Sequence, residues 1–216
     1  MRRVATTAAG KSSGHDVAAA IRADAGTKGR ILDIAERLVQ VCGFNGFSYG
    51  DVAAELGITR AALHYHFASK AELGEALIDR YTARFGRALD DLEAGSGFAP
   101  DLLRGYAGLY RDVLRQERMC LCGMLAAEYQ TLPPAMRAAV VRFLDQNETW
   151  LAAVLEQGAA AGSVQAGASA RDTARMIIGG LEGAMLVARP YGDVGRFDAA
   201  AASLLAGVTG ATATAS

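Results

Sequence analysis

The fold is decided by residues 48–67, which read SYGDVAAELGITRAALHYHF. Ser48 and Thr59 are residue types that favour helix N-caps, and each predicts a short helix immediately after it. Gly57 lies between the two predicted helices, where the absence of a side chain allows a tight turn. The apolar side chains that the two helices are expected to share as a core are Val52, Leu56, Ile58 and Leu63. The pattern predicts a helix-turn-helix, with helices from Tyr49 to Leu56 and from Arg60 to about Tyr65.

The second predicted helix carries small and basic side chains that suit the major groove of DNA. Arg60 can donate two hydrogen bonds to a guanine edge, and an alanine methyl group can contact a thymine methyl group. Backbone N–H groups at the start of the next helix, near Ser69, are suited to phosphates. The candidate DNA-binding residues are Ser48, Tyr49, Thr59, Arg60, Ala61, Ala62, His64, Tyr65, His66 and Lys70. The two histidines have a second interpretation as metal ligands, but no third ligand lies nearby in the sequence.

Helical periodicity continues along the chain and predicts an all-α fold of about nine helices. Ser69, with Glu72 three residues later, resembles a capping box and starts a long helix that runs from Lys70 to about Glu93. The other helices are predicted over about 28–42, 100–117, 121–129, 135–161, 170–188 and 194–208. We expect an N-terminal three-helix DNA-binding head and a larger C-terminal helical domain for ligand binding and dimerisation. The predicted division is a disordered tail at 1–25 with at most a short helix near 16–24, the head at 26–70, the larger domain at 71–208 and a flexible tail at 209–216.

The sequence resembles the TetR (tetracycline-repressor-like) family over residues 28–75. The most specific part is residues 57–73, GITRAALHYHFASKAEL, in which the aromatic-rich end of the second helix precedes Ser69 and Lys70. Gly50 departs from the family, whose members often place a longer polar or basic side chain there. The resemblance implies that bases face Arg60, Ala61, Ala62 and His64, and that the DNA backbone is held by Ser48, Tyr65, His66 and Lys70. It also implies a double-stranded, palindromic DNA operator, repression as the common mode and release by a small-molecule effector.

Charge and cysteine content agree with a cytoplasmic DNA-binding protein. Residues 1–70 hold nine Lys and Arg against six Asp and Glu, whereas residues 71–216 hold thirteen against seventeen, so a mildly basic head precedes an acidic body. Three cysteines give no disulfide framework and fit a reducing compartment. Arg2 and Arg3 are followed by no continuous apolar segment, and no apolar run reaches the roughly 18 residues of a membrane span, so we expect neither export nor a membrane.

The predicted helix at 170–188 indicates a homodimer. It is apolar on nearly every side, and a helix of that kind must be buried. Gly179 and Gly183 lie four residues apart and permit close contact with another helix. Family architecture implies that the last two long helices pair with their copies, and a palindromic operator requires two heads. Burial inside a single chain is the alternative.

An effector pocket is expected between the helices of the larger domain. The candidate ligand-binding residues are Tyr106, Tyr110, Met119, Cys120, Cys122, Met124, Phe143, Trp150 and Met176, with Tyr129 as a further lining residue. For each of these residues a plain core role is the alternative. Glu128 and Glu182 lie in apolar surroundings and either orient a ligand or make structural hydrogen bonds.

Cys120 and Cys122 support an alternative function on the same scaffold, a thiol-based sensor of oxidants or electrophiles. Arg115 and Arg118 lie nearby in sequence and can lower the pKa of a thiol. Two other interpretations stay open, small buried apolar residues and a metal site. The sequence contains no nucleophile–base pair, phosphate-binding loop or metal-ligand cluster, so we expect a protein that is not an enzyme and uses no cofactor or metal.

Overall fold

The computed structural model describes residues 14–165 and 169–210, and within these ranges the chain is helical with no β-strand. This confirms the predicted all-α fold. The helices are α1 (Gly14–Cys42), α2 (Tyr49–Leu56), α3 (Arg60–His66), α4 (Lys70–Gly95), α5 (Ala99–Leu114), α6 (Leu121–Ala127), α7 (Pro134–Ala160), α8 (Ala170–Ala188) and α9 (Val194–Thr209), with short 3-10 helices at Tyr129–Thr131 (η1) and Arg189–Tyr191 (η2).

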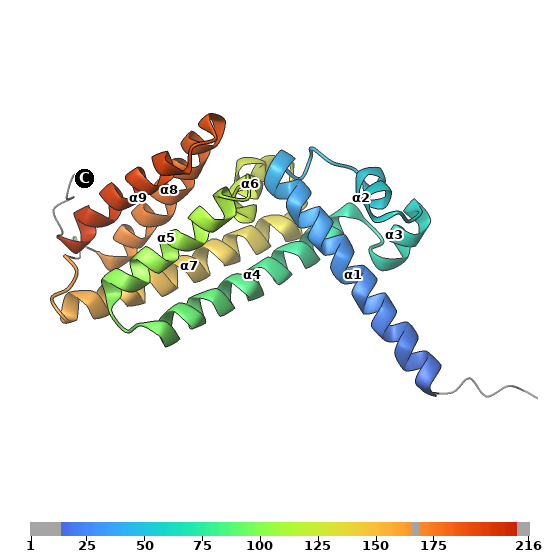
Figure 1. Cartoon of the computed structure of the whole chain (residues 1–216), viewed down its shortest axis with the longest axis horizontal. Coiled ribbons are helices and arrows are strands. Elements are labelled where there is room, and N and C mark those ends of the chain that lie inside the picture. The colour runs from blue at the N-terminus through green and yellow to red at the C-terminus, as the bar shows by residue number, and fades with distance from the viewer. Residues whose placement is uncertain (1–13, 166–168, 211–216) are drawn as a thin grey trace, which may run out of the picture.

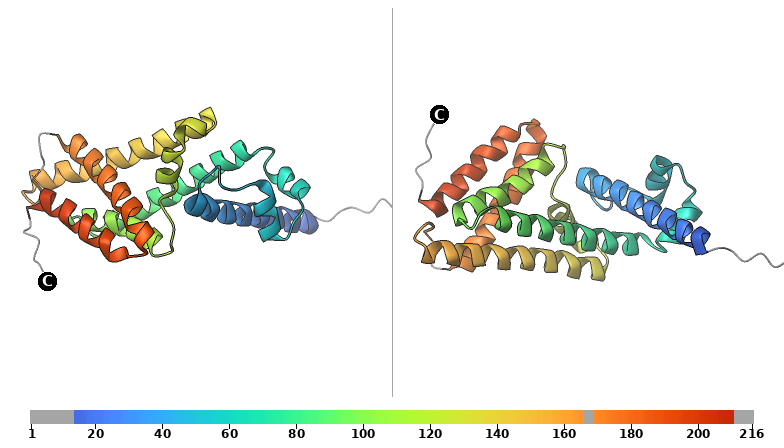
Figure 2. Two further views of the ribbon diagram at one scale, coloured as in Figure 1. Left: turned by 90° about the horizontal axis from the view of Figure 1, so that it is seen from above. Right: turned by 60° about the horizontal axis from the view of Figure 1, so that its bottom comes forward.

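The molecule is elongated, with a small head at one end and a larger helical body at the other (Figure 1). Helices α1, α2 and α3 form the head, and α4 starts beside it and runs away into the body. In the body, α7 packs against α4, α5 and α8, while α8 and α9 pair at the far side (Figure 2). Helix α3 and the body, where we expect an effector to bind, are therefore joined through α1, α4 and the segment around α6.

Cap residues set the boundaries of the head helices. The Ser48 side chain accepts a hydrogen bond from the Asp51 N–H, and the Asp51 carboxylate accepts one from the Ser48 N–H in return. Gly57 ends α2 in the left-handed region at φ 71°, which glycine adopts without steric cost. Ser69 caps α4 as predicted, but the Glu72 carboxylate accepts from Ala68 N–H instead of closing the box on Ser69.

Two boundaries differ from the prediction. Helix α1 begins at Gly14, so residues 14–25, which the sequence placed mainly in a disordered tail, continue the helix. Alanine-rich residues in this segment favour a helix, and α1 continues through Thr27 without a break. Helix α5 ends at Leu114, before the predicted end at Glu117, because Glu117 adopts a left-handed φ of 58°. The predicted tails at 1–13 and 211–216 lie outside the described residues.

Ion pairs join the head to the body. Glu36 on α1 is only 6% exposed, and its two carboxylate oxygens bond Arg80 and Arg84 on α4. Arg80 also pairs with Asp33 at 2.7 Å. A buried carboxylate that is shared by two guanidinium groups fixes the angle between α1 and α4 more firmly than exposed pairs do.

Hydrogen bonds also hold the C-terminal end of α1 against the body. The Met119 N–H, just before α6, donates to the Gln40 carbonyl at 3.1 Å. The Arg189 guanidinium in η2, directly after α8, donates to the Val41 carbonyl. A shift of α6 or of the end of α8 therefore acts directly on the last turn of α1.

Candidate nucleic-acid interface and effector site

Helix α3 is anchored to the head by its apolar side. Leu63 is fully buried, and Phe67, its C-cap, is almost so. Val52 and Leu56 from α2 belong to the same core, as the sequence predicted. The Thr59 hydroxyl accepts the Ala62 N–H at 3.1 Å and fixes the first turn. With one side packed and the first turn capped, the opposite side of α3 is held outward.

The outward side of α3 carries most of the predicted base-reading residues. Arg60, Ala61, His64 and Tyr65 are exposed, and Tyr65 has 81% of its surface accessible. Ala62 and His66 are half-buried at the edges of this face. This face therefore presents small, basic and aromatic side chains to solvent. These residues, together with their N-cap Thr59, are called the reading face below.

Two of the predicted DNA-binding residues, Tyr49 and Lys70, form hydrogen bonds within the head. The Tyr49 hydroxyl donates to the Phe67 carbonyl at 3.0 Å, and burial raises the pKa of Tyr49 to about 12. The Tyr49 ring packs on His64 with 4.7 Å between ring centroids. The Lys70 ammonium donates to the carbonyls of Phe44 and Phe47 and lies over both rings, and burial lowers its pKa. Lys70 therefore retains one donor for a phosphate, and Tyr49 supports His64 from behind.

Sequence reasoning missed two features of the interface. The Arg60 guanidinium lies against Gly50, where a Cβ atom would be 2.5 Å from Arg60 Nη2. The proximity of Arg60 also contributes to lowering the pKa of Asp51, after the larger effect of its hydrogen bonds with Ser48. Lys28 on α1 is exposed, and its ammonium lies 5.0 Å from the Phe67 ring centroid, which adds a cation beside the end of α3. The absence of a side chain at Gly50 was the only sequence signal for the first feature.

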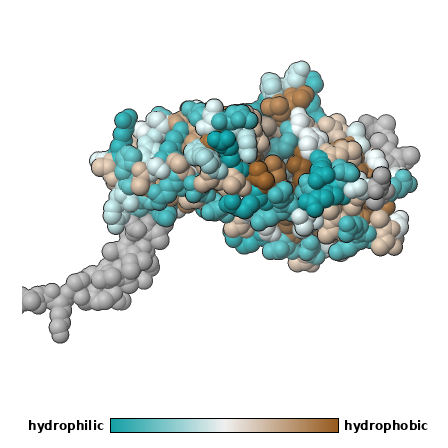
Figure 3. All heavy atoms as spheres, turned by 180° about the vertical axis from the view of Figure 1, so that it is seen from behind, coloured by the Kyte–Doolittle hydropathy of each residue, from teal (hydrophilic) through white to brown (hydrophobic). Residues whose placement is uncertain are grey.

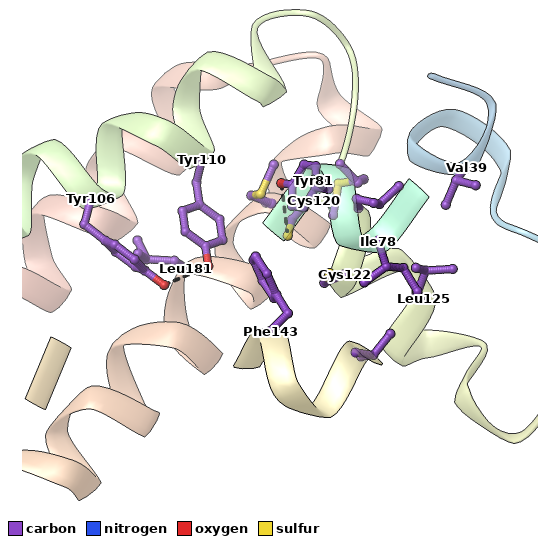
Figure 4. Packing of buried hydrophobic residues seen from close by; sticks show 14 of the residues in the cluster. Val39, Ile78, Tyr81, Tyr106, Tyr110, Cys120, Cys122, Leu125, Phe143 and Leu181 are labelled. Carbon is purple, nitrogen blue, oxygen red and sulfur yellow. Dashed lines mark hydrogen bonds between the residues drawn. The ribbon is translucent and has the colours of Figure 1, made fainter. Parts of the chain in front are cut away.

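The body contains a cluster of aromatic side chains that includes three predicted effector residues. Phe143 lies between Tyr81 on one side and Tyr106 and Tyr110 on the other in the close view (Figure 4). Phe85 joins them, with ring centroids 5.3 Å from Phe143, 6.0 Å from Tyr106 and 6.2 Å from Tyr110. The Tyr106 and Tyr110 hydroxyls are 3.1 Å apart. These five rings are called the aromatic cluster below.

Two predicted residues lie at the margins of the aromatic cluster, and one lies outside it. Trp150 stacks on Tyr106 at 5.7 Å and donates its indole N–H to Glu93. Met124 is half-buried, with its sulfur 3.8 Å from an Arg189 nitrogen. Met176 is 49% exposed on the outer side of α8, so the prediction that it lines an internal pocket is wrong. Its neighbour Ile177 faces inward instead.

Cys120 and Cys122 are both buried beside the aromatic cluster, together with Met119. The Tyr81 hydroxyl donates to the Cys120 sulfur at 3.7 Å. Burial raises the pKa of both thiols well above the usual value, and Glu182 raises them further. The expectation that Arg115 and Arg118 lower these pKa values is wrong, because desolvation dominates. Both cysteines thus have the properties of core residues and not of reactive thiolates.

The two glutamates have different roles. The Glu128 carboxylate accepts the Phe44 N–H at 2.6 Å and the Asn45 N–H at 3.3 Å, so it caps the chain after α1, which agrees with a structural hydrogen bond. The Glu182 carboxyl is hydrogen-bonded by the Cys120 thiol, while its Oε1 is buried without a hydrogen-bond partner among the described residues. Burial raises the pKa of Glu182 to about 6.

Helix α8 is buried on one side only. Ile177, Leu181 and Met185 face the core, whereas Leu186 and Val187 are each 62% exposed. Glycines at 179 and 183 have open space beside them on the exposed side. In a space-filling view, hydrophobic atoms reach the surface at the projecting tip formed by the end of α8 and the start of α9 (Figure 3). The single chain therefore leaves an apolar surface uncovered.

The described residues were also considered as possible metal ligands and membrane spans. They contain no group of three or more His, Cys, Asp or Glu side chains arranged to hold a metal ion. They also contain no helix that is both long and apolar enough to span a membrane.

Comparison with known proteins assigns both parts of the chain. Residues 31–77 match the family described as bacterial regulatory proteins of the tetR family, and residues 101–204 match the tetracyclin repressor-like C-terminal domain. A TetR-family regulator from Agrobacterium tumefaciens is 31% identical with a TM-score of 0.83, over 86% of this chain and 99% of that chain. A TetR regulator from Legionella pneumophila is 32% identical with a TM-score of 0.76, over 82% and 95% of the two chains. The transcriptional regulator AcuR of Cereibacter sphaeroides is 26% identical over 151 residues, which are 68% of this chain and 69% of AcuR. This chain belongs to the TetR family of transcriptional regulators.

Proposed function

We propose that this regulator is a homodimeric repressor that binds a palindromic operator in the bacterial cytoplasm and is released by a small-molecule effector. The observation that carries the proposal is the reading face, which combines small side chains with Arg60 and stands outward on a firmly anchored helix. Small residues let a helix approach base edges, while Arg60 supplies a guanine-reading fork. Lys28 and the free donor of Lys70 supply positive charge for phosphates.

Dimerisation through α8 and α9 is supported by the uncovered apolar surface. Met176, Leu186 and Val187 line it, and the open glycines allow two helices to approach closely. A homodimer places two reading faces on one duplex, as a palindromic operator requires.

Release by an effector is supported by the contacts that join the body to the head. The aromatic cluster adjoins Cys120 at the start of α6, and Met119, two residues before α6, is bonded to Gln40 near the end of α1. An effector that prefers one arrangement of α4 and α6 also selects one position of the head, so it lowers operator affinity by its difference in affinity for the two states. A thiol-based release mechanism receives less support, because both body cysteines are buried with raised thiol pKa values.

Fluorescence anisotropy with labelled duplex from the region upstream of the protein's own gene tests this proposal. We expect wild-type protein to bind at physiological salt and Arg60→Ala to weaken specific binding by about 1–3 kcal/mol. Arg87→Ala is the matched control, since Arg87 is an exposed arginine on α4 in the body. Equal operator affinity of the Arg60→Ala and wild-type proteins contradicts the assigned reading face. No binding of wild-type protein at low salt contradicts the function.

A further inference from the structure

Glu182 is the polar group whose surroundings are least explained by folding alone. It lies on α8 and its carboxyl reaches the backbone of Gly123 on α6, where a Cβ atom would overlap Oε2. The Oε1 atom is buried and accepts no hydrogen bond from the described residues. An ionised carboxylate that is removed from water costs several kcal/mol unless a partner compensates it.

The groups around this carboxyl are thiols and phenols. The Cys120 thiol bonds the Glu182 carboxyl, and the Tyr81 hydroxyl lies 3.7 Å from the Cys120 sulfur. Burial raises the pKa values of Tyr81, Tyr106, Tyr110, Cys120 and Cys122, and the negative charge of Glu182 adds to the effect. The influences on the Glu182 carboxyl itself are burial and the hydrogen bond from Cys120. The pocket therefore contains one concentrated negative charge among neutral groups.

The aromatic cluster adjoins this carboxyl through Cys120 and Tyr81. The faces of Tyr and Phe rings are negative and attract cations within about 6 Å of the ring centroid. Tyr81 and Phe143 are 5.6 Å apart between centroids, and Tyr106 and Tyr110 are 5.4 Å apart. A carboxylate next to an aromatic cluster has the chemistry to bind an ammonium-type group on an apolar body.

A route from solvent leads toward this region. A cavity of about 220 Å³ opens between α4 and α5, and its lining includes Tyr81, Phe85, Leu109 and Val113. Tyr81 and Phe85 also belong to the aromatic cluster, so two of its rings form part of the cavity wall. Arg84 also lines the cavity, where its guanidinium lies 5.3 Å from the Tyr81 ring centroid and is paired with Glu36.

We propose that the effector of this regulator is an organic cation whose positive group is bound by the Glu182 carboxylate and whose apolar body lies in the aromatic cluster. This inference rests on the proposed ligand-responsive function and adds the chemical class of the ligand. Cys120 acts as a positioning residue, because its thiol is hydrogen-bonded to the Glu182 carboxyl.

Three small probes of similar size distinguish a cation site from a general apolar pocket. Benzyltrimethylammonium carries a positive charge, benzyl alcohol is neutral and phenylacetate is negative. Binding to the full-length dimer is measured by calorimetry and by the fluorescence of Trp150, which stacks on Tyr106 and is the single tryptophan. We expect saturable binding of the cation and at least about tenfold weaker binding of the other two probes.

Substitution of Glu182→Gln keeps the size and the acceptor but removes the charge. It is expected to weaken cation binding at least about tenfold and to leave benzyl alcohol binding unchanged. Glu156→Gln, an exposed glutamate on α7, is the matched control. Equal cation affinity in wild-type and Glu182→Gln proteins, a preference for phenylacetate, or no saturable cation binding at millimolar concentration overturns the proposal.

Operator binding of the same preparations separates this inference from the proposed function. If wild-type protein binds its operator but the cation does not bind, the cation site is rejected and the DNA-binding function stands. If wild-type protein does not bind operator DNA, the proposed function fails whatever the probes show. Thermal unfolding of Glu182→Gln checks its fold, and an unfolding temperature at or above that of wild-type protein is expected because a buried charge has been removed.

Discussion

The Arg60 guanidinium rests on the backbone of Gly50, and a Cβ atom at Gly50 would come within 2.5 Å of its Nη2. Arg60 starts the reading helix, whereas Gly50 lies in the first turn of α2. The missing side chain at Gly50 therefore provides the space in which Arg60 lies beside Asp51. The departure from the family at Gly50 is explained by this relationship: the position accommodates the Arg60 side chain from the next helix.

Gly50→Ala is expected to raise the free energy of unfolding by up to about 1 kcal/mol. Alanine favours a helix over glycine, and the atoms nearest to the added methyl group belong to the movable end of Arg60. Gly57→Ala is the matched comparison, because Gly57 has φ 71° and a side chain there is strained even though the space beside it is open. It is expected to lower stability by about 1 kcal/mol. Urea unfolding measures the change in the free energy of unfolding for both variants. A change of the same sign in both contradicts the different roles assigned to Gly50 and Gly57.

Val187→Asp is expected to convert the dimer to monomers. Val187 is 62% exposed on α8, and a carboxylate there is not tolerated in an apolar interface. Operator affinity should fall by about two orders of magnitude or more, because two linked heads bind far more tightly than one. Analytical ultracentrifugation and anisotropy measure the two effects. Val141→Asp on α7, where the valine is 42% exposed, should leave the dimer intact; a dimeric Val187→Asp protein would place the interface elsewhere.

Whether the sequence predicts a contact depends on how far apart the interacting groups lie in the chain. Ser48, Thr59 and Ser69 each bond a backbone group three residues away, so local sequence was enough to predict the helix starts. The donors of Lys70 reach carbonyls more than twenty residues away, and the tertiary fold alone determines that contact.

The sequence was also insufficient to predict which face of α8 packs into the body. Met176, Ile177 and Ile178 are consecutive apolar residues, so periodicity could not tell which of them faces inward. The structure buries Ile177 and exposes much of Met176, because α8 must satisfy its contacts with α7 and α9. For this reason the sequence predicted the exposed face of α3 better than the inward face of α8.

Glu182 should make stability depend on pH in a definite direction. Burial raises its pKa in the folded protein from the ordinary 4.5 to about 6. The protonated form therefore contributes stability that is fully present below pH 4.5 and is lost as pH rises through about 6. Relative to wild-type protein, the free energy of unfolding of Glu182→Gln should rise by about 2 kcal/mol as pH goes from 4.5 to about 6, and it should rise no further at higher pH. Urea unfolding at several pH values measures the difference, with Glu156→Gln as the control; a pH-independent difference contradicts the burial of the ionised carboxyl.

Thiol labelling tests whether the cysteines of the body can act as a switch. Cys42 is exposed at the end of α1, while Cys120 and Cys122 are buried and have raised pKa values. A disulfide reagent at neutral pH is therefore expected to modify one thiol per chain quickly and the other two only as fast as the body opens locally. In a Cys42→Ser variant the fast reaction should disappear, and peroxide should leave operator binding unchanged. Fast labelling of that variant, or release of its operator by peroxide, would restore the thiol sensor as the better account, because reactive thiolates must then form within the α6 segment.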